Sequence, residues 1–263
     1  MAKHLFIIGA QRSGTTYLFN ILDEHPEVCM AKPVKPEPKY FMNFANGDQS
    51  YNTYHSKYFI NAGNVSWLGE KSTSYIESEE ALFSIKRLLP EATILVMLRN
   101  PVERAISNYC FTKDHGLEPY DFERAIQEER SRIHLWNNAG TSVSPYAYTE
   151  RGKYTQYLDR WSQLFKNQQF VPLVAEQIIG NWAAIAALYK QLDIDSQFIP
   201  SSLMIKVNSC SENRANCIIP CHLRATLQDV FRPWNDLLKM RYGLDVSCWE
   251  KEDYTSFRKE SSK

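Results

Sequence analysis

A short segment near the N-terminus has the residues of a phosphate-binding loop. Gly9 and Gly14 are separated by four residues, and Thr15 and Thr16 follow at once. Glycines at this spacing let the backbone fold tightly, so that successive N–H groups point into one concavity at a helix N-terminus and attract an anion. The threonine hydroxyls add further donors. An ordinary glycine turn is the alternative, which the spacing and the paired hydroxyls together disfavour.

This loop departs from the nucleotide-kinase version in two ways. Thr15 stands where a kinase loop carries lysine, and Arg99 follows an apolar run where an NTPase often has a magnesium-binding aspartate. Such a site would bind phosphate through protein cations and amides. Arg12 within the loop, Arg99 and Ser107 are therefore candidate ligands. Taken singly, Arg99 could equally be a surface ion-pair partner and Ser107 a small packing residue.

Strands and helices alternate along the chain and would place these residues at one sheet edge. The apolar runs 5–9, 93–98 and 170–175 are typical of buried parallel strands, and 67–71 is a further short strand. Periodic apolar positions predict the helices, which are expected over 15–24, 51–59, 79–89, 102–110, 122–133, 154–165, 181–191 and 223–230. The sequence therefore predicts a three-layer α/β/α fold with a central parallel sheet and a P-loop-like phosphate-binding loop.

Length and composition exclude several classes of protein. A chain of 263 residues suits a single domain over residues 1–263. Thirty basic residues balance thirty acidic ones, which argues against a nucleic-acid partner. No window approaches the roughly 18 apolar residues of a membrane span, and the apolar run 5–8 is too short for a signal peptide. We therefore expect a cytoplasmic protein that starts at or near Met1 and needs no membrane.

The six cysteines do not form the pattern of a small disulfide scaffold. Cys210, Cys217, Cys221 and His222 could be drawn as a zinc site, but their spacing fits none of the common paired-ligand patterns. We favour free thiols and expect no metal.

Two motifs resemble those of sulfotransferases that use 3′-phosphoadenosine 5′-phosphosulfate (PAPS). Residues 11–16, Gln-Arg-Ser-Gly-Thr-Thr, resemble the family's 5′-phosphosulfate loop, and residues 98–109 resemble its 3′-phosphate segment. The resemblance is good over residues 4–110, weak around residues 151–154, and returns at residues 233–238. It implies a small bacterial-type member of the branch that uses a glutamate base, as glycan and tyrosyl-protein sulfotransferases do.

The resemblance assigns nucleotide ligands residue by residue. Arg12 takes the place of the loop cation that stabilises the bridging oxygen as the sulfuryl group leaves. Arg99 and Ser107 would bind the 3′-phosphate that distinguishes PAPS from ATP. The 5′-phosphate would be held by Ser13, Gly14, Thr15 and Thr16.

Residues 208–216 resemble only loosely a later loop of the family that covers PAPS. Arg214 is the candidate ligand in this segment. Secreted relatives have a disulfide near this loop. Cys210 and Cys217 could form it, although a cytoplasmic setting disfavours oxidation.

The catalytic groups are also implied by the resemblance. Residues 36–41 resemble the Glu-x-x-aromatic-aromatic segment of the glutamate branch, so Glu37 would be the general base. A solvated loop carboxylate is the alternative for Glu37. Lys71 resembles a lysine that lies near the sulfuryl group. The implied reaction is an in-line displacement at sulfur, in which Glu37 takes the acceptor's proton while Arg12 and Lys71 stabilise the leaving adenosine 3′,5′-bisphosphate.

The sequence defines the acceptor less well. A neutral net charge and the acidic stretch 118–129 disfavour a long polyanionic glycan, so a small metabolite or natural product with a hydroxyl or amine is the first hypothesis. A glycan or lipooligosaccharide hydroxyl is the second. Two other classes stay open. One is a nucleotide-dependent metabolite kinase, disfavoured by the missing loop lysine, and the other is a non-catalytic nucleotide-binding protein, disfavoured by the retained catalytic set.

Overall fold

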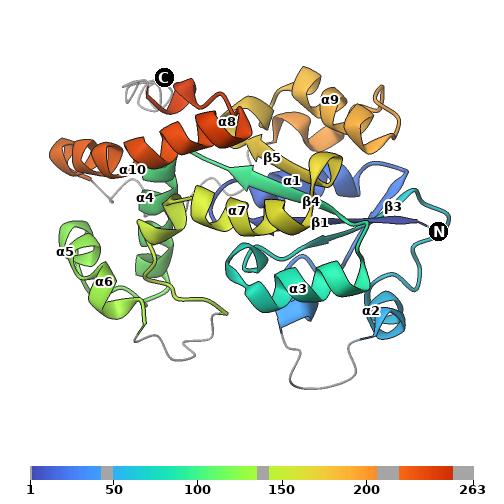
Figure 1. Cartoon of the computed structure of the whole chain (residues 1–263), viewed down its shortest axis with the longest axis horizontal. Coiled ribbons are helices and arrows are strands. Elements are labelled where there is room, and N and C mark those ends of the chain that lie inside the picture. The colour runs from blue at the N-terminus through green and yellow to red at the C-terminus, as the bar shows by residue number, and fades with distance from the viewer. Residues whose placement is uncertain (1, 43–49, 135–141, 206–218, 251–263) are drawn as a thin grey trace, which may run out of the picture.

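A parallel sheet of five strands forms the centre of the computed structural model (Figure 1). The structure describes residues 2–42, 50–134, 142–205 and 219–250. The strand order is β2-β3-β1-β4-β5, so the chain changes its direction of winding between β1 and β4, where open α/β sheets bind their ligands. The strands are β1 (Lys3–Gly9), β2 (Val28–Met30), β3 (Trp67–Lys71), β4 (Thr93–Leu98) and β5 (Phe170–Val174).

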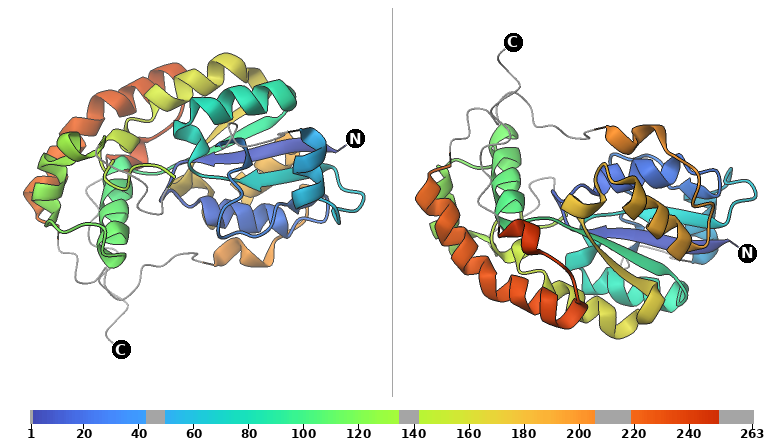
Figure 2. Two further views of the ribbon diagram at one scale, coloured as in Figure 1. Left: turned by 90° about the horizontal axis from the view of Figure 1, so that it is seen from below. Right: turned by 90° about the horizontal axis from the view of Figure 1, so that it is seen from above.

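The strands are buried because helices cover both faces of the sheet (Figure 2). One face packs against α3 (Glu79–Leu88) and α7 (Thr155–Leu164), and the other against α1 (Thr15–Asp23) and α9 (Trp182–Leu192). All six residues of β4 are buried, as a parallel strand covered on both sides requires. The predicted three-layer α/β/α fold is confirmed. That residues 1–263 form one domain stays a prediction.

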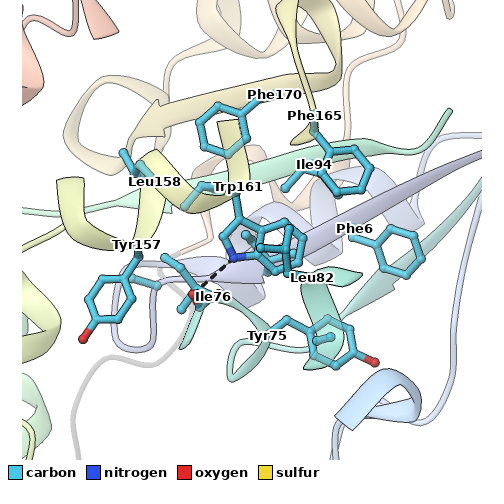
Figure 3. Packing of buried hydrophobic residues seen from close by; sticks show 14 of the residues in the cluster. Phe6, Tyr75, Ile76, Leu82, Ile94, Tyr157, Leu158, Trp161, Phe165 and Phe170 are labelled. Atoms are coloured by element: carbon cyan, nitrogen blue, oxygen red, sulfur yellow. Dashed lines mark hydrogen bonds between the residues drawn. The ribbon is translucent and has the colours of Figure 1, made fainter. Parts of the chain in front are cut away.

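Trp161 lies at the centre of the packing between α7 and the sheet (Figure 3). Its ring is buried among aliphatic and aromatic side chains from α3, β4 and β5. The indole Nε1 donates to the carbonyl oxygen of Ile76 at 3.2 Å, which satisfies its one polar atom. This contact fixes α7 over the segment that follows β3, close to the candidate site.

A third group of helices gathers beyond the C-terminal ends of the strands (Figure 1). In it, α4 (Pro101–Asp114) packs against α10 (Cys221–Tyr242) through buried side chains such as Ile106 and Phe231. The remaining helices are α2 (Tyr51–Tyr58), α5 (Phe122–Gln127), α6 (Glu129–Arg132) and α8 (Ala175–Ile178).

The two ends of the sheet are short or interrupted. β2 has three residues and was not expected from the sequence, because so short a run carries no periodic signal. At the opposite edge, β5 contains Pro172, which lies opposite Val96 of β4. Proline is tolerated there because an edge strand is hydrogen-bonded on one side only.

Three helix predictions were wrong in their extent. The helix expected over 102–110 continues to Asp114. The helix expected over 122–133 is divided at Glu128 into α5 and α6, and the Glu129 carboxylate accepts from the amides of Thr149 and Glu150. The helix expected to stop at residue 230 continues through Pro233. An interior proline costs about 3 kcal/mol, and buried side chains on both sides of it, Phe231 among them, offset that cost.

Gly152 permits the close approach of a short 3-10 turn, Glu150–Gly152, to α10. A Cβ at this position would lie 2.4 Å from Cε1 of the buried Phe231 ring. We expect Gly152→Ala to lower the free energy of unfolding by about 1–3 kcal/mol, the usual cost of overpacking. Urea denaturation measures it, and an unchanged midpoint would show that the ring can move aside.

Candidate active site

The predicted phosphate loop joins β1 to α1 and has the backbone that an anion site needs. Gly14 is the residue before α1 and has a φ of 83°, and Arg12 has a φ of 68°. A Cβ at Gly14 would also lie 2.9 Å from Cδ1 of Ile179, so both conformation and space favour glycine. Gly14 supplies no side-chain cap. The first-turn amides of Thr15 and Thr16, which have no intrahelical acceptor, can therefore point at a phosphate.

The three residues assigned to the two ends of the nucleotide meet at this loop. Arg12 Nε donates to Ser107 Oγ at 3.1 Å, and Arg99 Nη1 donates to the carbonyl oxygen of Arg12 at 3.4 Å. Ser107 lies on α4, and Arg99 follows β4. The guanidinium of Arg12 also lies 4.9 Å from the ring centroid of Phe111, a cation–π contact. Two cations and a hydroxyl are thus gathered beside the helix N-terminus.

Tyr154 holds the segment after β4 against the loop and was not predicted as a site residue. Its buried hydroxyl donates to the carbonyl oxygen of Arg99 at 2.7 Å and accepts from the backbone N–H of Arg99 at 3.4 Å. Burial raises the pKa of this hydroxyl, so Tyr154 is a neutral donor. The only signal in the sequence was the weak family resemblance around residues 151–154.

Glu37 and Lys71 form a second cluster at the end of β3. Lys71 Nζ lies 2.6 Å from Glu37 Oε1, and the two side chains are 4% and 15% exposed. The backbone N–H of Thr73 donates to Glu37 Oε2 at 2.9 Å, and the Thr73 hydroxyl also donates to this carboxylate. Glu37 is therefore a held carboxylate and not a freely solvated one. Thr73 was missed by sequence reasoning, although it lies two residues after Lys71.

Short contacts join the two clusters. Gln11 of the phosphate loop donates from Nε2 to the hydroxyl of Ser74 at 3.3 Å. The amide of Ser72 donates to the carbonyl oxygen of Ile7 at 3.1 Å, which extends the pairing of β3 with β1 beyond Lys71. Because both clusters follow neighbouring parallel strands, they lie at the same edge of the sheet.

Some predicted residues lie outside the described part of the chain. Arg214, Cys210 and Cys217 are among them, so their roles stay predictions. Among the residues that the structure does describe, no group of three or more His, Cys, Asp or Glu side chains is placed to hold a metal ion. No helix within that part is long and apolar enough to cross a membrane.

Glu70, the residue before Lys71, is fully buried, and this raises the pKa of its carboxyl from 4.5 to about 7. Between these values the folded state binds more protons than the unfolded state, so the Glu70 contribution to stability is complete below pH 4.5 and is lost as the pH rises to about 7. The shift corresponds to about 3 kcal/mol.

We therefore expect Glu70→Gln to remove this decline. Urea unfolding of the wild type and of Glu70→Gln at pH 4.5 and pH 7.5 measures the free energy of unfolding of each protein. Buried His4, whose lowered pKa of about 4 makes stability rise with pH, is common to both proteins and cancels in the comparison. If the free energies of unfolding of the wild type and the variant differed by the same amount at both pH values, the expectation would be contradicted.

Comparison with known proteins identifies the family of this chain. The model of the sulfotransferase domain matches residues 2–196. The chain belongs to the sulfotransferase family. The family resemblance seen in the two sequence motifs is thereby confirmed.

Two curated relatives are matched over part of their length. The membrane-associated sulfotransferase kil1 of Dictyostelium discoideum is 34% identical over 138 residues, 49% of this chain and 28% of that protein. The human bifunctional heparan sulfate N-deacetylase/N-sulfotransferase 1 is 30% identical over 285 residues, 97% of this chain and 31% of that protein. This sulfotransferase chain thus spans under a third of either relative.

A solved structure shares the fold. The sulfotransferase from Alicyclobacillus acidocaldarius superposes on this sulfotransferase with a TM-score of 0.76 at 21% sequence identity, over 95% of this chain and all of that one. At this identity the likeness extends to the architecture of the sheet and its helices.

Proposed function

We propose that this sulfotransferase uses PAPS to transfer a sulfuryl group to a hydroxyl or amine of a small metabolite or natural product. The observation that carries the proposal is the meeting of Arg12, Arg99 and Ser107 beside the open N-terminus of α1. Two phosphates of one nucleotide need two anion-binding features close together. The helix N-terminus supplies one, and the cation–hydroxyl cluster supplies the other.

The nucleotide would be divided between these features. The amides and hydroxyls of Thr15 and Thr16, with Ser13 and Gly14, take the 5′-phosphate. Arg99 and Ser107 take the 3′-phosphate. A guanidinium suits this position because its planar fork of donors matches phosphate oxygens and keeps its charge.

The chemical step is an in-line displacement at sulfur. The acceptor oxygen or nitrogen forms a bond to sulfur while the bond between sulfur and the bridging phosphate oxygen breaks. Glu37 accepts the acceptor's proton, and adenosine 3′,5′-bisphosphate leaves. Arg12 and Lys71 stabilise the negative charge that develops on the bridging oxygen. Lys71 and Thr73 hold the Glu37 carboxyl in a fixed orientation, as a base requires.

A glycan acceptor is the second candidate, and one observation favours it. The relative that aligns with 97% of this chain is named for heparan sulfate N-deacetylation and N-sulfation. Against it stand the equal numbers of basic and acidic residues, because a polyanion is best bound by an excess of basic ones.

Transfer of labelled sulfuryl from PAPS to a panel of alcohols, amines and oligosaccharides tests the proposal. We expect labelled product without added magnesium. Magnesium-dependent phosphoryl transfer from ATP in place of sulfuryl transfer would show a kinase. Tight binding of adenosine 3′,5′-bisphosphate without transfer to any acceptor would favour a non-catalytic nucleotide-binding protein.

A further inference from the structure

Glu70 is a buried carboxyl that the proposed chemistry does not use. It lies on β3 and is 0% exposed. Successive side chains of a strand point to opposite faces, so Glu70 points away from its neighbour Lys71, toward the aromatic core around Phe41 and Tyr54. Burying a carboxyl there is costly unless it is hydrogen-bonded, and the Ser72 hydroxyl donates to its Oε1 atom.

The first partner leads back to the segment that carries Glu37. The hydroxyl of Ser72 donates to Glu70 Oε1 at 2.6 Å, and the Ser72 Oγ atom accepts from the backbone N–H of Lys39 at 2.9 Å. Lys39 is two residues beyond Glu37 and has a φ of 47°, a conformation that needs support from its surroundings.

The second partner leads to the same segment at a later residue. The Tyr75 hydroxyl faces the Glu70 carboxyl, and its oxygen accepts from the backbone N–H of Phe41 at 3.0 Å. Tyr75 is 0% exposed, so this bridge is shielded from water. Two hydroxyls beside one carboxyl thus hold two backbone amides, at residues 39 and 41.

The segment that these bridges hold has little regular structure of its own. Residues 31–39 contain no helix or strand, and the 3-10 turn Tyr40–Met42 follows. Glu37 is tied directly to Thr73 and Lys71. The bridges from Glu70 fix the backbone immediately after it, in a part of the chain that packing alone would hold weakly.

We propose that Glu70 is a positioning residue, which holds residues 39–41, and with them the Glu37 carboxylate, in the transfer geometry through the hydroxyls of Ser72 and Tyr75. The inference rests on the proposed function of Glu37 as the base. The ionisable groups that act on Glu70 are Tyr54 and Tyr58 from α2, Tyr75, and Glu37 itself. The hydroxyl of Ser72 donates to the carboxyl directly.

Single-bridge variants test the proposal by turnover. Ser72→Ala removes the bridge to residue 39, and Tyr75→Phe removes the bridge to residue 41. We expect each to lower kcat about 10- to 100-fold, the scale of a base displaced by a fraction of an ångström, with the KM for PAPS unchanged. Ser72→Thr, which keeps the hydroxyl, should restore kcat. Tyr54→Phe is the matched control: it removes a hydroxyl that faces Glu70 but that binds no amide of residues 39–41.

Amide hydrogen exchange supplies a second readout that does not depend on transfer. In Glu70→Gln we expect the amides of Lys39 and Phe41 to exchange faster than in the wild type. If that variant does not fold, Ser72→Ala should show the effect at Lys39 alone and Tyr75→Phe at Phe41 alone.

The outcomes separate the two proposals. Wild-type kcat and unchanged exchange in both single-bridge variants would overturn the positioning role and leave the proposed function intact. A wild type that transfers no sulfuryl group, with exchange altered as expected, would count against the proposed function and leave the two bridges from Glu70 in place.

Discussion

Replacing Glu37 with glutamine is expected to lower the rate of sulfuryl transfer by about 10²- to 10⁴-fold, the usual contribution of a general base. Glutamine has nearly the same shape, and its carbonyl oxygen can still accept from Thr73, but it cannot take a proton. Binding of adenosine 3′,5′-bisphosphate should be retained, because the proposed nucleotide ligands follow β1 and β4, whereas Glu37 accepts from Lys71 and Thr73. Steady-state transfer assays and calorimetric titration measure the two quantities.

Glu27→Gln is a matched control for that experiment. Glu27 also accepts from a backbone N–H and a hydroxyl, those of Asp195 and Ser66, but it precedes β2 at the opposite edge of the sheet. We expect the control to keep wild-type turnover. Wild-type turnover in Glu37→Gln would remove Glu37 as the base, and loss of nucleotide binding in it would show that the substitution disturbs the fold.

Removing the Arg99 side chain should separate nucleotides that differ only in the 3′-phosphate. Hydrogen bonds to charged groups contribute about 1.5–3 kcal/mol, so Arg99→Ala should weaken binding of adenosine 3′,5′-bisphosphate by about 10- to 100-fold. AMP, which lacks the 3′-phosphate, should lose little. Titration of both nucleotides into wild type and variant gives the ratio directly.

Arg232→Ala is the control for this comparison, because Arg232 is an exposed residue of α10 that pairs only with Asp229 among the described residues. An equal loss of affinity for both nucleotides in Arg99→Ala would mean that Arg99 binds the 5′-phosphate or that it supports the conformation of the loop. The second reading has a physical basis, since Arg99 also donates to the carbonyl oxygen of Arg12.

The sequence predicted well those elements whose pattern is locally strong. The strand over 93–98 is continuous and apolar and was found at its true bounds. The helix over 79–88 differs from expectation by one residue at its C-terminal end, and the helix over 182–192 by one residue at each end. Elements that depend on distant contacts were not found. β2 exists because three residues pair with β3, and α10 continues past Pro233 because its flanking side chains are buried against other helices.

The candidate site was predictable where motifs follow strands. Parallel strands end at one edge, so residues after β1 and β4 had to converge, and Arg12 and Ser107 are indeed 3.1 Å apart. Residues that act on these groups from elsewhere in the chain carried no such signal. Tyr154 reaches Arg99 from 55 positions away, and a tyrosine beside a helix start is indistinguishable in sequence from a core residue. The nucleotide and catalytic roles themselves stay predictions.

The short β2 and the proline of β5 have a consequence for the behaviour of this protein at high concentration. A parallel sheet exposes unpaired amides and carbonyls along both outer strands, and another chain can add to such a strand and begin aggregation. At one end only three residues offer such a template, and at the other Pro172 lacks the N–H that an incoming strand would need. Both outer strands of the sheet are therefore poor templates for strand addition. This disfavours aggregation through the sheet and leaves the edge that carries the candidate site accessible.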